Sequence, residues 1–429
     1  MIAFQLPGDK SISHRALILA CLADRQSRIQ NLPGSADVNS TRSALAAIGA
    51  VISDSEVGVV QVSGPTGWRP HPGPIDCGNS GTTSRLLMGL LVGLGVPASL
   101  TGDESLRKRP MDRVVYPLQS MGGRISYTER RDRLPISLEE RTSGSLRVLR
   151  YRGRVASAQV KSALLLAGLG AGVEVEVREP GVSRDHTERM LGSLGIPIEF
   201  GRLHDGGARV LLVGQPDRVS LPGFDLAIPG DVSSASFLIA AGLLTGQPVR
   251  IEGVGLNETR TGFLNVMRRM GAAVTEQVVE SRLGEPVGSI DVVPGPLAAF
   301  EIEADEVPGL IDEIPVLAAL AARARGGSRI SGAGELRVKE SDRLAGLARN
   351  LGAIGVECEE RQDGLIIEGS NRSLCGMIST GGDHRIAMAF AALGRSPDCA
   401  IEVDDRDCVN VSYPGFWNDL KQIATGSDS

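Results

Sequence analysis

The chain has 429 residues, of which 42% are hydrophobic and 22% are charged. These proportions are typical of a folded protein rather than a disordered one, and the length exceeds what one ordinary core accommodates, so two or three domains are expected. The formal net charge of −6 and the aromatic content of 3% argue against a surface that follows a nucleic-acid backbone or stacks its bases.

Residues 1–8 contain no basic segment followed by an apolar one, so the sequence predicts no signal peptide. The longest apolar stretch, residues 86–100, is interrupted by three glycines and a proline and is too short to span a bilayer. The six cysteines form no C-x-x-C pair, which favours reduced thiols. We therefore expect a cytoplasmic protein that does not bind membranes.

The first elements in chain order form one supersecondary unit. A polar opening at residues 8–11 precedes a predicted helix at 11–23, a strand at 27–32 and a second helix at 37–48. The last two predicted elements of the unit are short strands, at 50–52 and 57–62.

The same order of elements recurs six times, at a spacing of about 75 residues. Each unit begins with a polar or glycine-rich opening before an apolar helix, and a glycine ends its second helix. The openings lie at residues 8–11, 78–81, 156–159, 230–233, 310–313 and 382–385. The glycines are Gly49, Gly122, Gly195, Gly271 and Gly352, with a weaker sixth at Gly426. This period predicts β-α-β-α-β-β units along the whole chain.

Six units divide naturally into two domains of three. A segment rich in proline and glycine, residues 219–230, lies where the third unit ends and predicts a crossover. We expect one domain to contain both termini, with residues 1–8 and 228–429, and the other to be inserted as residues 9–227.

The polar openings suit anions, because a helix N-terminus presents free N–H groups and the positive end of the helix dipole. Lys10 and Ser11 begin the first helix and Arg15 follows one turn later. Their ammonium, hydroxyl and guanidinium groups can meet on a phosphate or carboxylate. A capped helix with two solvated cations is the alternative. A P-loop is disfavoured, because the upstream glycine of G-x-x-x-x-G-K-[ST] is missing.

In the second opening, Gly78 and Gly81 allow a ligand to approach the backbone, and Asn79 and Thr82 add hydrogen-bonding groups. The alternative is an ordinary tight turn with a helix cap. Further along, Arg109 ends a run of three cations and precedes a proline that sets the direction of the chain. Such a run is otherwise a solvated loop.

The densest charge cluster lies at residues 335–343. Lys339 and Arg343 are four residues apart, on one face of a predicted helix, with Glu340 beside them. A salt-bridged surface helix is the alternative for such a pattern.

Asp312 and Arg385 stand at the last two openings. Asp312 is either a plain helix cap or a catalytic base, and the second role needs a nearby cation. Arg385 would point at an anion, and His384 before it is interpreted as a capping residue. The chain has five histidines and no close set of His, Cys and carboxylate residues, so we expect no metal site.

Together, in this order and spacing, the motifs resemble the EPSP synthase (3-phosphoshikimate 1-carboxyvinyltransferase) family. The resemblance runs from about residue 7 to residue 417. The matching patterns are K-S-x-S-x-R, G-N-x-G-T, R-P, S-x-Q, a late aspartate, R-V-K-E-[ST]-D-R and D-H-R.

The resemblance implies an α/β (α+β) enolpyruvyl transferase fold with two similar domains, each of three βαβαββ repeats with pseudo-threefold symmetry, that close on the substrates. It implies transfer of the enolpyruvyl group of phosphoenolpyruvate to the 5-hydroxyl of shikimate 3-phosphate with release of phosphate, a step of aromatic amino-acid and chorismate biosynthesis. No metal or organic cofactor, nucleic acid or membrane is implied, and we expect a monomer.

The resemblance also assigns roles to individual residues. One set would bind shikimate 3-phosphate: Lys10, Ser11, Arg15, Ser157, Gln159, Arg184, Asp312 and Lys339. An overlapping set would bind phosphoenolpyruvate: Lys10, Asn79, Gly81, Thr82, Arg109, Gln159, Arg343 and Arg385. Asp312 is the expected base for the attacking hydroxyl. Glu340 and Lys10 are the candidates for handling the proton of the methylene carbon, and the sequence does not rank them.

Three features resemble a more divergent bacterial class of the family. Residue 158 is alanine where many relatives have serine, residue 411 is valine where some have lysine, and residues 184–188 read R-D-H-T-E. Some members of that class tolerate the inhibitor glyphosate through alanine at the position of Gly81. Because this chain keeps the glycine, we expect glyphosate to compete with phosphoenolpyruvate.

Three rival interpretations are weaker. UDP-N-acetylglucosamine 1-carboxyvinyltransferases share the repeat fold but usually carry a cysteine in the loop that corresponds to residues 103–108, which has none here. A nucleic-acid clamp built from repeated α/β units needs a basic inner face. A catalytically inactive relative is disfavoured, because every matched catalytic position holds a competent residue.

Overall fold

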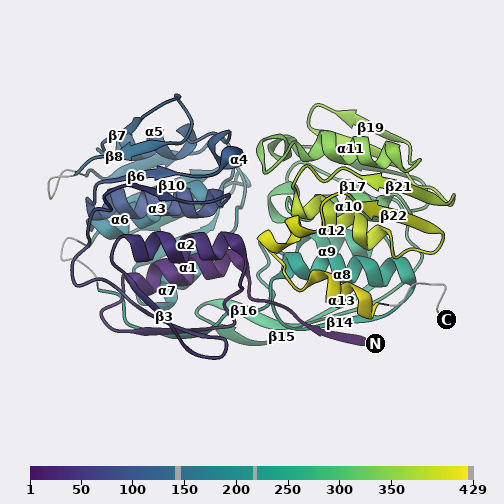
Figure 1. The fold of residues 1–429 in the computed structure, drawn as a ribbon, viewed down its shortest axis with the longest axis horizontal. Coiled ribbons are helices and arrows are strands. Elements are labelled where there is room, and N and C mark those ends of the chain that lie inside the picture. Colours follow the sequence, from purple (N-terminus) through teal and green to yellow (C-terminus); the bar gives the residue numbers. More distant parts are fainter. Residues whose placement is uncertain (141–145, 216–219, 424–429) are drawn as a thin grey trace. The chain divides into compact units, whose positions relative to one another are not determined.

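The computed structural model describes residues 1–140, 146–215 and 220–423. Within these ranges the chain forms helices α1–α13, short 3-10 helices and strands β1–β22 (Figure 1). It divides into two compact units. The terminal unit contains Met1–Pro7, Pro229–Ser281 and Pro286–Ser429, and the central unit contains Gly8–Ile228 and Arg282–Glu285.

The central unit contains three four-stranded sheets of one design. In each, a first strand pairs in parallel with a second, which pairs antiparallel with the second strand of a hairpin. The sheet orders are β13 (Asp225–Ala227), β2 (Ser27–Gln30), β4 (Val59–Ser63), β3 (Val51–Glu56); β5 (Pro74–Asp76), β6 (Ala98–Thr101), β8 (Ile136–Leu138), β7 (Ile125–Tyr127); and β9 (Leu149–Arg152), β10 (Val175–Glu179), β12 (Ala208–Leu212), β11 (Ile198–Arg202).

The terminal unit repeats this design twice and then shortens it. Its four-stranded sheets have the orders β1 (Ile2–Gln5), β14 (Val249–Gly255), β16 (Glu285–Val293), β15 (Ala273–Arg282) and β17 (Glu301–Ile302), β18 (Gly327–Ile330), β20 (Gly364–Glu368), β19 (Cys358–Arg361). The last sheet is the parallel pair β21 (Leu374–Ile378) and β22 (Cys399–Val403). The predicted architecture of repeated α/β units is thus confirmed. Gly426, the weak sixth glycine, lies outside the described residues.

Each inner helix follows one of the six polar openings. The inner helices are α1 (Lys10–Cys21), α3 (Gly81–Leu94), α6 (Ala158–Ala171), α8 (Val232–Thr245), α10 (Ile314–Ala321) and α12 (His384–Leu393). Every residue of α10 and α12 is buried, as expected for helices that protein surrounds on all sides. Among the described helices, none combines the length and the hydropathy that crossing a bilayer requires.

The outer helices bury one face only, against the core of their own unit. They are α2 (Ala36–Ala47), α5 (Asp112–Ser120), α7 (His186–Ser193), α9 (Gly262–Arg269) and α11 (Arg343–Ala353). Shorter helices complete the fold: α4 (Glu104–Arg107), α13 (Phe416–Gln422), η1 (Val307–Gly309), η2 (Gly334–Val338) and η3 (Asp407–Val411).

Two inner helices of the central unit, α3 and α6, pack at backbone contact distance. A Cβ atom on Gly89 would lie 2.1 Å from the carbonyl oxygen of Ala163, and one on Gly93 would lie 2.6 Å from that of Ala167. Glycine is therefore needed at both positions of α3. The close packing brings the N-termini of α3 and α6 together, and both termini carry predicted site residues.

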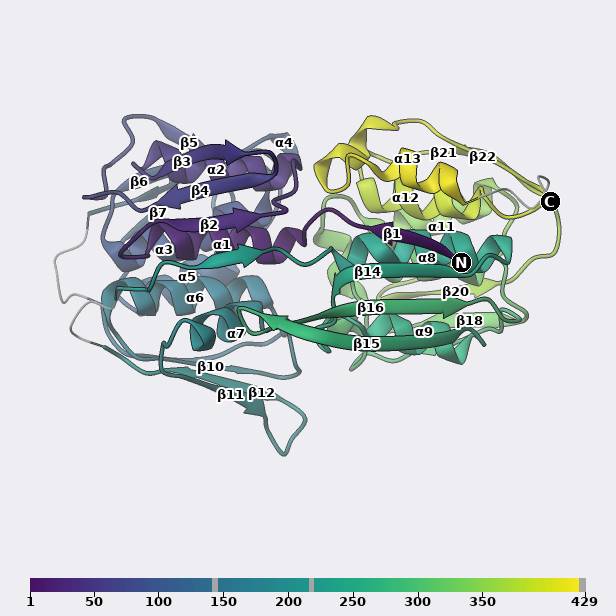
Figure 2. The same cartoon turned by 90° about the horizontal axis from the view of Figure 1, so that it is seen from below.

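Two strands near the points where the chain changes units pair with strands that are distant in the sequence. β1 pairs in parallel with β14 of the terminal unit, and β13 pairs in parallel with β2 of the central unit. Figure 2 shows β1 beside β14, followed by β16 and β15. The tip of the β15–β16 hairpin, Arg282–Glu285, belongs to the central unit, where Glu285 contacts His186 Nδ1 at 2.8 Å.

Candidate active site

Side chains join the openings of the three inner helices of the central unit. Arg15 on α1 donates from Nη2 to Ser162 Oγ on α6 at 2.7 Å. Arg85 on α3 donates from Nη1 to Gln159 Oε1 on α6 at 2.8 Å. The N-termini of α1, α3 and α6 therefore meet in one group of residues, which we call the central cluster.

Lys10 lies at a helix start, as predicted, and is the first residue of α1, one residue before the predicted start of the helix. Asp9 caps this helix by accepting a hydrogen bond from Ile12 N at 2.9 Å. The Lys10 ammonium pairs with Asp37 at 2.8 Å. Ser11 beside it is half-buried. An ammonium, a hydroxyl and a helix N-terminus thus occur together, as an anion site requires.

Arg15 lies deeper than Lys10 and is only 4% exposed. Its Nε donates to Thr187 Oγ1 at 2.7 Å, and its Nη1 donates to the Ser11 carbonyl oxygen at 2.9 Å. Burial lowers the pKa of Arg15 to about 10, which leaves it charged at neutral pH. The alternative interpretation of a helix with two solvated cations is wrong, because Arg15 is buried and Lys10 is paired.

The second opening places Arg109 against the start of α3. Arg109 is 7% exposed and donates to Asn79 Oδ1, so it does not belong to a solvated loop. Gly78 has a φ of +56°, which side chains rarely adopt. A Cβ atom on Gly81 would lie 2.6 Å from Arg85 Nη1 and 3.4 Å from Arg109 Nη1. Residue 81 therefore faces two guanidinium groups.

The start of α6 adds further groups to the central cluster. Gln159 donates from Nε2 to Thr82 Oγ1 at 3.0 Å, while its Oε1 accepts from Arg85. Ser157 caps α6 by accepting a hydrogen bond from Val160 N. Arg184 lies half-buried in the loop before α7.

In the terminal unit, three cations surround the carboxylate of Asp312. Its oxygens lie 3.5 Å from Arg343 Nη1, 3.7 Å from Arg385 Nη2 and 4.0 Å from Lys339 Nζ. Arg385 also donates from Nη1 to the Asp312 carbonyl oxygen at 2.9 Å. With Glu340, these residues form what we call the terminal cluster. A catalytic base needs a nearby cation, and Asp312 has three.

Arg343 is the most enclosed cation of the terminal cluster, at 1% exposure. It donates to Asp383 from Nε at 2.8 Å and from Nη2 at 3.2 Å, and to Glu340 at 2.7 Å. Burial alone would lower the pKa of Arg343, but the carboxylates of Asp383 and Glu340 outweigh burial and raise it. Burial would also raise the pKa of Asp383, yet Arg343 keeps it below its usual value.

The prediction that Lys339 and Arg343 share one helical face is wrong. The 3-10 helix η2 ends at Val338, Lys339 is extended, and α11 begins at Arg343. The two cations reach Asp312 from the turn between these helices. The alternative of a salt-bridged surface helix is wrong as well, because Arg343 is buried.

The interpretation of Asp312 as a helix cap is wrong, because Asp312 is not the N-cap of α10. Glu313 holds the N-cap position, without a side-chain cap bond. Glu313 is buried and accepts a hydrogen bond from Ser233 Oγ, which in turn accepts one from Arg260 Nη2. The fourth opening therefore does more than cap α8, because it holds the neighbour of Asp312 in place.

Like Asp37, which pairs with Lys10, Asp383 and Arg85 are charged residues outside the predicted set that contribute to the clusters. Asp383 binds Arg343, and Arg85 binds Gln159. Asp383 could have been suspected from its place at the sixth opening, and Arg85 from its place one turn after Gly81. The sequence offered no sign of their partners, because these contacts join residues 40 and 74 positions apart.

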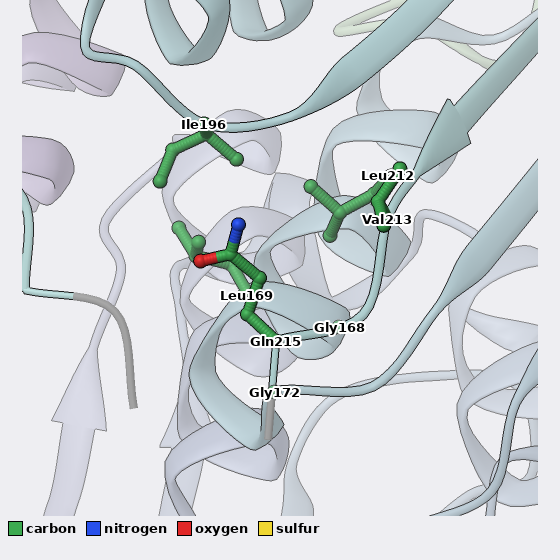
Figure 3. Close-up of a pocket in the computed structure, with 7 residues that line it drawn as sticks. All are labelled: Gly168, Leu169, Gly172, Ile196, Leu212, Val213 and Gln215. Carbon is green, nitrogen blue, oxygen red and sulfur yellow. The ribbon is translucent and has the colours of Figure 1, made fainter. Parts of the chain in front are cut away.

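A small hollow at the other end of α6 does not match the predicted site (Figure 3). It is lined by Gly168, Leu169, Gly172, Ile196, Leu212, Val213 and Gln215. The lining is apolar apart from Gln215, so it offers no charge to an anion. Across the described ranges, no group of three or more His, Cys, Asp or Glu residues is placed to hold a metal ion.

Comparison with known proteins identifies the family of the chain. Residues 3–420 match the family described as EPSP synthase (3-phosphoshikimate 1-carboxyvinyltransferase). The chain is 44% identical to the 3-phosphoshikimate 1-carboxyvinyltransferase of Salinibacter ruber, with 98% of this chain and 96% of the relative covered. It is also 44% identical to that of Thermus thermophilus, with 99% and 96% covered.

Solved structures lead to the same family. The EPSP synthase of Acinetobacter baumannii has a TM-score of 0.82 and 36% identity, with 99% of this chain and 95% of that chain covered. The enolpyruvyl transferase NikO of Streptomyces tendae has a TM-score of 0.74 at 19% identity, covering 99% and 94%, and shows the shared fold. The chain belongs to the EPSP synthase (3-phosphoshikimate 1-carboxyvinyltransferase) family.

Proposed function

We propose that the protein transfers the enolpyruvyl group of phosphoenolpyruvate to the 5-hydroxyl of shikimate 3-phosphate and releases phosphate. The observation that carries this proposal is the Asp312 carboxylate among Lys339, Arg343 and Arg385. A positioned base beside cations can both remove a hydroxyl proton and stabilise anionic groups. Membership of the family supports the same reaction.

The charges of the substrates match those of the two clusters. Each substrate carries a phosphate and a carboxylate, so four anionic groups need cations. Arginine suits both groups, because its planar fork donates two parallel hydrogen bonds. On this proposal Arg109, Arg343 and Arg385 bind phosphoenolpyruvate, together with Lys10, Asn79, Gly81, Thr82 and Gln159. Shikimate 3-phosphate is bound by Lys10, Ser11, Arg15, Ser157, Gln159, Arg184, Asp312 and Lys339.

The proposed reaction is an addition followed by an elimination. In the addition, the 5-hydroxyl oxygen bonds to C2 of phosphoenolpyruvate, Asp312 accepts the hydroxyl proton, and C3 gains a proton. In the elimination, C3 loses a proton and the bond between C2 and the phosphate oxygen breaks. The cations near Asp312 hold its carboxylate in place while charge develops on the reacting groups.

Glu340 and Lys10 are the two candidates for the proton at C3. Glu340 accepts a hydrogen bond from Arg343, and Lys10 is paired with Asp37. Reaction in deuterated water separates the two, because the responsible group delivers solvent deuterium to C3. Between Glu340→Gln and Lys10→Met, the variant that abolishes deuterium incorporation while still binding both substrates in calorimetry identifies the group.

A phosphate-release assay tests the proposed function. Phosphate should appear when shikimate 3-phosphate and phosphoenolpyruvate are both present, and should not appear when either is omitted. Mass spectrometry should identify 5-enolpyruvylshikimate 3-phosphate as the second product. Release that depends on UDP-N-acetylglucosamine instead of shikimate 3-phosphate would replace this proposal with the rival transferase.

A further inference from the structure

A buried ionic group lies behind the start of α6, and the proposed reaction does not use it. Lys161 sits in the first turn of α6 and is 2% exposed. Its Nζ lies 2.8 Å from Glu188 Oε1 on α7 and 3.1 Å from Glu179 Oε2 at the end of β10. Burial would lower the pKa of Lys161, but the two carboxylates outweigh this and raise it, so the ammonium form persists.

Within this group, Glu179 connects two segments that carry predicted ligands of shikimate 3-phosphate. Its Oε1 accepts a hydrogen bond from Ser157 N at 2.6 Å, at the cap of α6. Its Oε2 accepts one from Ser183 Oγ at 2.6 Å, in the loop before α7. Lys161 completes the connection by donating to the Ser183 carbonyl oxygen at 3.4 Å.

These contacts fix the backbone on both sides of Arg184. On one side, Ser183 is held by Glu179 and Lys161. On the other side, the Asp185 carbonyl oxygen accepts a hydrogen bond from Arg189 N at 3.0 Å, in the first turn of α7. The Arg184 side chain itself is half-buried. The loop is therefore anchored at the residues on both sides of Arg184.

The buried group of Lys161, Glu179 and Glu188 is hard to explain by a contribution to folding stability alone. Removing an ammonium and two carboxylates from water is strongly unfavourable, and well-packed apolar residues often stabilise a core as well or better. The contacts do, however, set the distance between Ser157 and the Arg184 loop. Groups that are held in place before a ligand arrives bind it without a further ordering cost.

We propose that Glu179 and Lys161 are positioning residues for shikimate 3-phosphate. They hold Ser157 and Arg184 at a fixed separation, so that the hydroxyl and the guanidinium meet the same anionic substrate. This inference rests on the proposed function, from which the roles of Ser157 and Arg184 are taken.

The variant Glu179→Gln tests the inference. Its amide oxygen can still accept from Ser157 N, but its NH₂ group cannot accept from Ser183 Oγ or pair with Lys161. We expect the Kd and the KM for shikimate 3-phosphate to rise by about tenfold or more, because a small displacement of the binding groups weakens their hydrogen bonds to the substrate. The KM for phosphoenolpyruvate and kcat should change by less than about threefold. Calorimetry measures the Kd, and the phosphate-release assay measures the rest.

Glu176→Gln is the matched control. Glu176 lies on the same strand, but its carboxylate pairs with Arg178, Arg209 and Arg150 instead of the two loops. Both KM values of this variant should stay within about twofold of the wild type. A general effect of charge loss on β10 would change both variants alike and would overturn the inference.

Ser183→Ala keeps the test valid if Glu179→Gln does not fold. It removes the hydroxyl that donates to Glu179 and leaves the charges of Glu179 and Lys161 in place. The Kd for shikimate 3-phosphate should rise by about threefold, with an unchanged unfolding midpoint in urea. An unchanged Kd in this variant, or an equal rise of both KM values in Glu179→Gln, would overturn the inference.

The binding measurement separates this inference from the proposed function. If the wild type binds shikimate 3-phosphate but releases no phosphate, the proposed function fails, and weaker binding by Glu179→Gln still supports the positioning role. If the wild type does not bind shikimate 3-phosphate, both fail. If turnover occurs as proposed and Glu179→Gln binds like the wild type, the inference alone fails.

Discussion

At the scale of single residues, the three cations around Asp312 give the proposed base a sharp test. Asp312→Asn keeps the size of the side chain and removes its ability to accept a proton. We expect kcat to fall by about 100-fold or more, the usual contribution of a general base. The Kd for shikimate 3-phosphate should change by less than about tenfold, because the other predicted ligands remain. Steady-state kinetics and calorimetry measure the two quantities.

Asp342→Asn is a useful control for Asp312→Asn. Asp342 caps α11 in the same unit and pairs with Arg337 rather than with the terminal cluster. Asparagine caps a helix about as well as aspartate and the pair with Arg337 is exposed, so kcat should stay within about twofold of the wild type and stability should change little. If Asp312→Asn keeps wild-type kcat, Asp312 is not the base.

Gly81 makes a second prediction, because its missing side chain faces two arginines. The Cβ atom of Gly81→Ala would lie 2.6 Å from Arg85 Nη1, so the Arg85 side chain must move and loosen its hydrogen bond to Gln159. We expect the KM for phosphoenolpyruvate to rise by about fivefold, roughly the effect of one lost hydrogen bond. The inhibition constant for glyphosate should rise as well, if glyphosate binds where phosphoenolpyruvate does.

Gly34→Ala controls for glycine replacement as such, because a Cβ atom on Gly34 would meet nothing within 4 Å. It should leave both constants unchanged. Glyphosate inhibition of the wild type that does not depend on the concentration of phosphoenolpyruvate would contradict the shared site.

His14 makes a prediction about pH. It is fully buried with Nδ1 2.6 Å from Thr41 Oγ1, and its pKa lies well below 6.5 because of burial and the nearby charges of Lys10 and Arg15, which outweigh Asp9. Below pH 6.5 the unfolded chain therefore binds a proton that the folded chain does not. Stability should fall as the pH drops, by about tenfold in the folding equilibrium per pH unit, until the folded pKa is reached.

The variant His14→Asn isolates this effect, because its amide can still bond to Thr41 but does not titrate. Hydrogen-exchange mass spectrometry of α1 between pH 7.5 and 5.5 measures the stability of the central unit in both proteins. The wild type should lose protection more steeply than the variant. Parallel pH profiles would show that His14 does not cause the loss.

At the scale of elements, the sequence predicts what depends on neighbouring residues. The helix predicted at 11–23 is α1 at Lys10–Cys21, and the helix predicted at 37–48 is α2 at Ala36–Ala47. Polar openings and helix-ending glycines are local signals, so they locate these boundaries well. The same signals placed Lys10 and Arg385 at helix starts, where the structure has them. Their roles toward substrates stay predictions.

Contacts between distant residues could not be predicted in this way. The pairings of β1 with β14 and of β13 with β2 join strands about 200 residues apart or more, and no local pattern encodes them. The break between η2 and α11 was not predicted, because the spacing of charged residues across it is compatible with one continuous helix. In the structure, Arg343 is buried and bonded to Asp383, a contact with a residue 40 positions away. The ionic group of Lys161, Glu179 and Glu188 was not predicted either, because its contacts join residues that are 18 or more positions apart.

The contact between α3 and α6 makes a prediction at this scale. Gly89→Ala places a Cβ atom 2.1 Å from the Ala163 carbonyl oxygen, so the two helices must separate. Overpacking of this kind costs about 1–3 kcal/mol of unfolding free energy, or more where backbone must move. Urea unfolding of the central unit measures the loss.

Gly192→Ala on α7 is the control in the same unit, because its Cβ atom would meet Ile198 at an ordinary 3.6 Å. Alanine is a better helix former than glycine, so this variant should be as stable as the wild type or slightly more stable. Equal unfolding free energies for Gly89→Ala and the wild type would show that α3 and α6 are not held at backbone contact.

At the scale of the whole molecule, both units share one arrangement of inner helices. Each buries three apolar helices inside its own core and leaves their polar openings to carry the charged residues. The repeats are equal as scaffolds but unequal in chemistry. The fifth and sixth openings carry Asp312 and Arg385, whereas the fourth supports Glu313 from within the core. On the proposed function, specificity depends on which residue each repeat places at the same structural position.

The position of β1 makes a prediction about the whole chain. Phe4 on β1 is 3% exposed and belongs to the core of the terminal unit, although the next element along the chain, α1, belongs to the central unit. Phe4→Ala should therefore destabilise the terminal unit, by about 3–5 kcal/mol for a buried phenylalanine. Hydrogen-exchange mass spectrometry should show lost protection in β14 and α8 but unchanged protection in β2 and α1.

Gln5→Ala on the same strand is the matched control, because Gln5 is exposed and contributes backbone pairing that alanine retains. Its exchange should match the wild type in both units. If Phe4→Ala loosens β2 and α1 as much as β14 and α8, the two cores unfold as one. A loss confined to the terminal unit would show instead that they unfold separately, with stability following the sheet that β1 joins rather than its neighbours in the sequence.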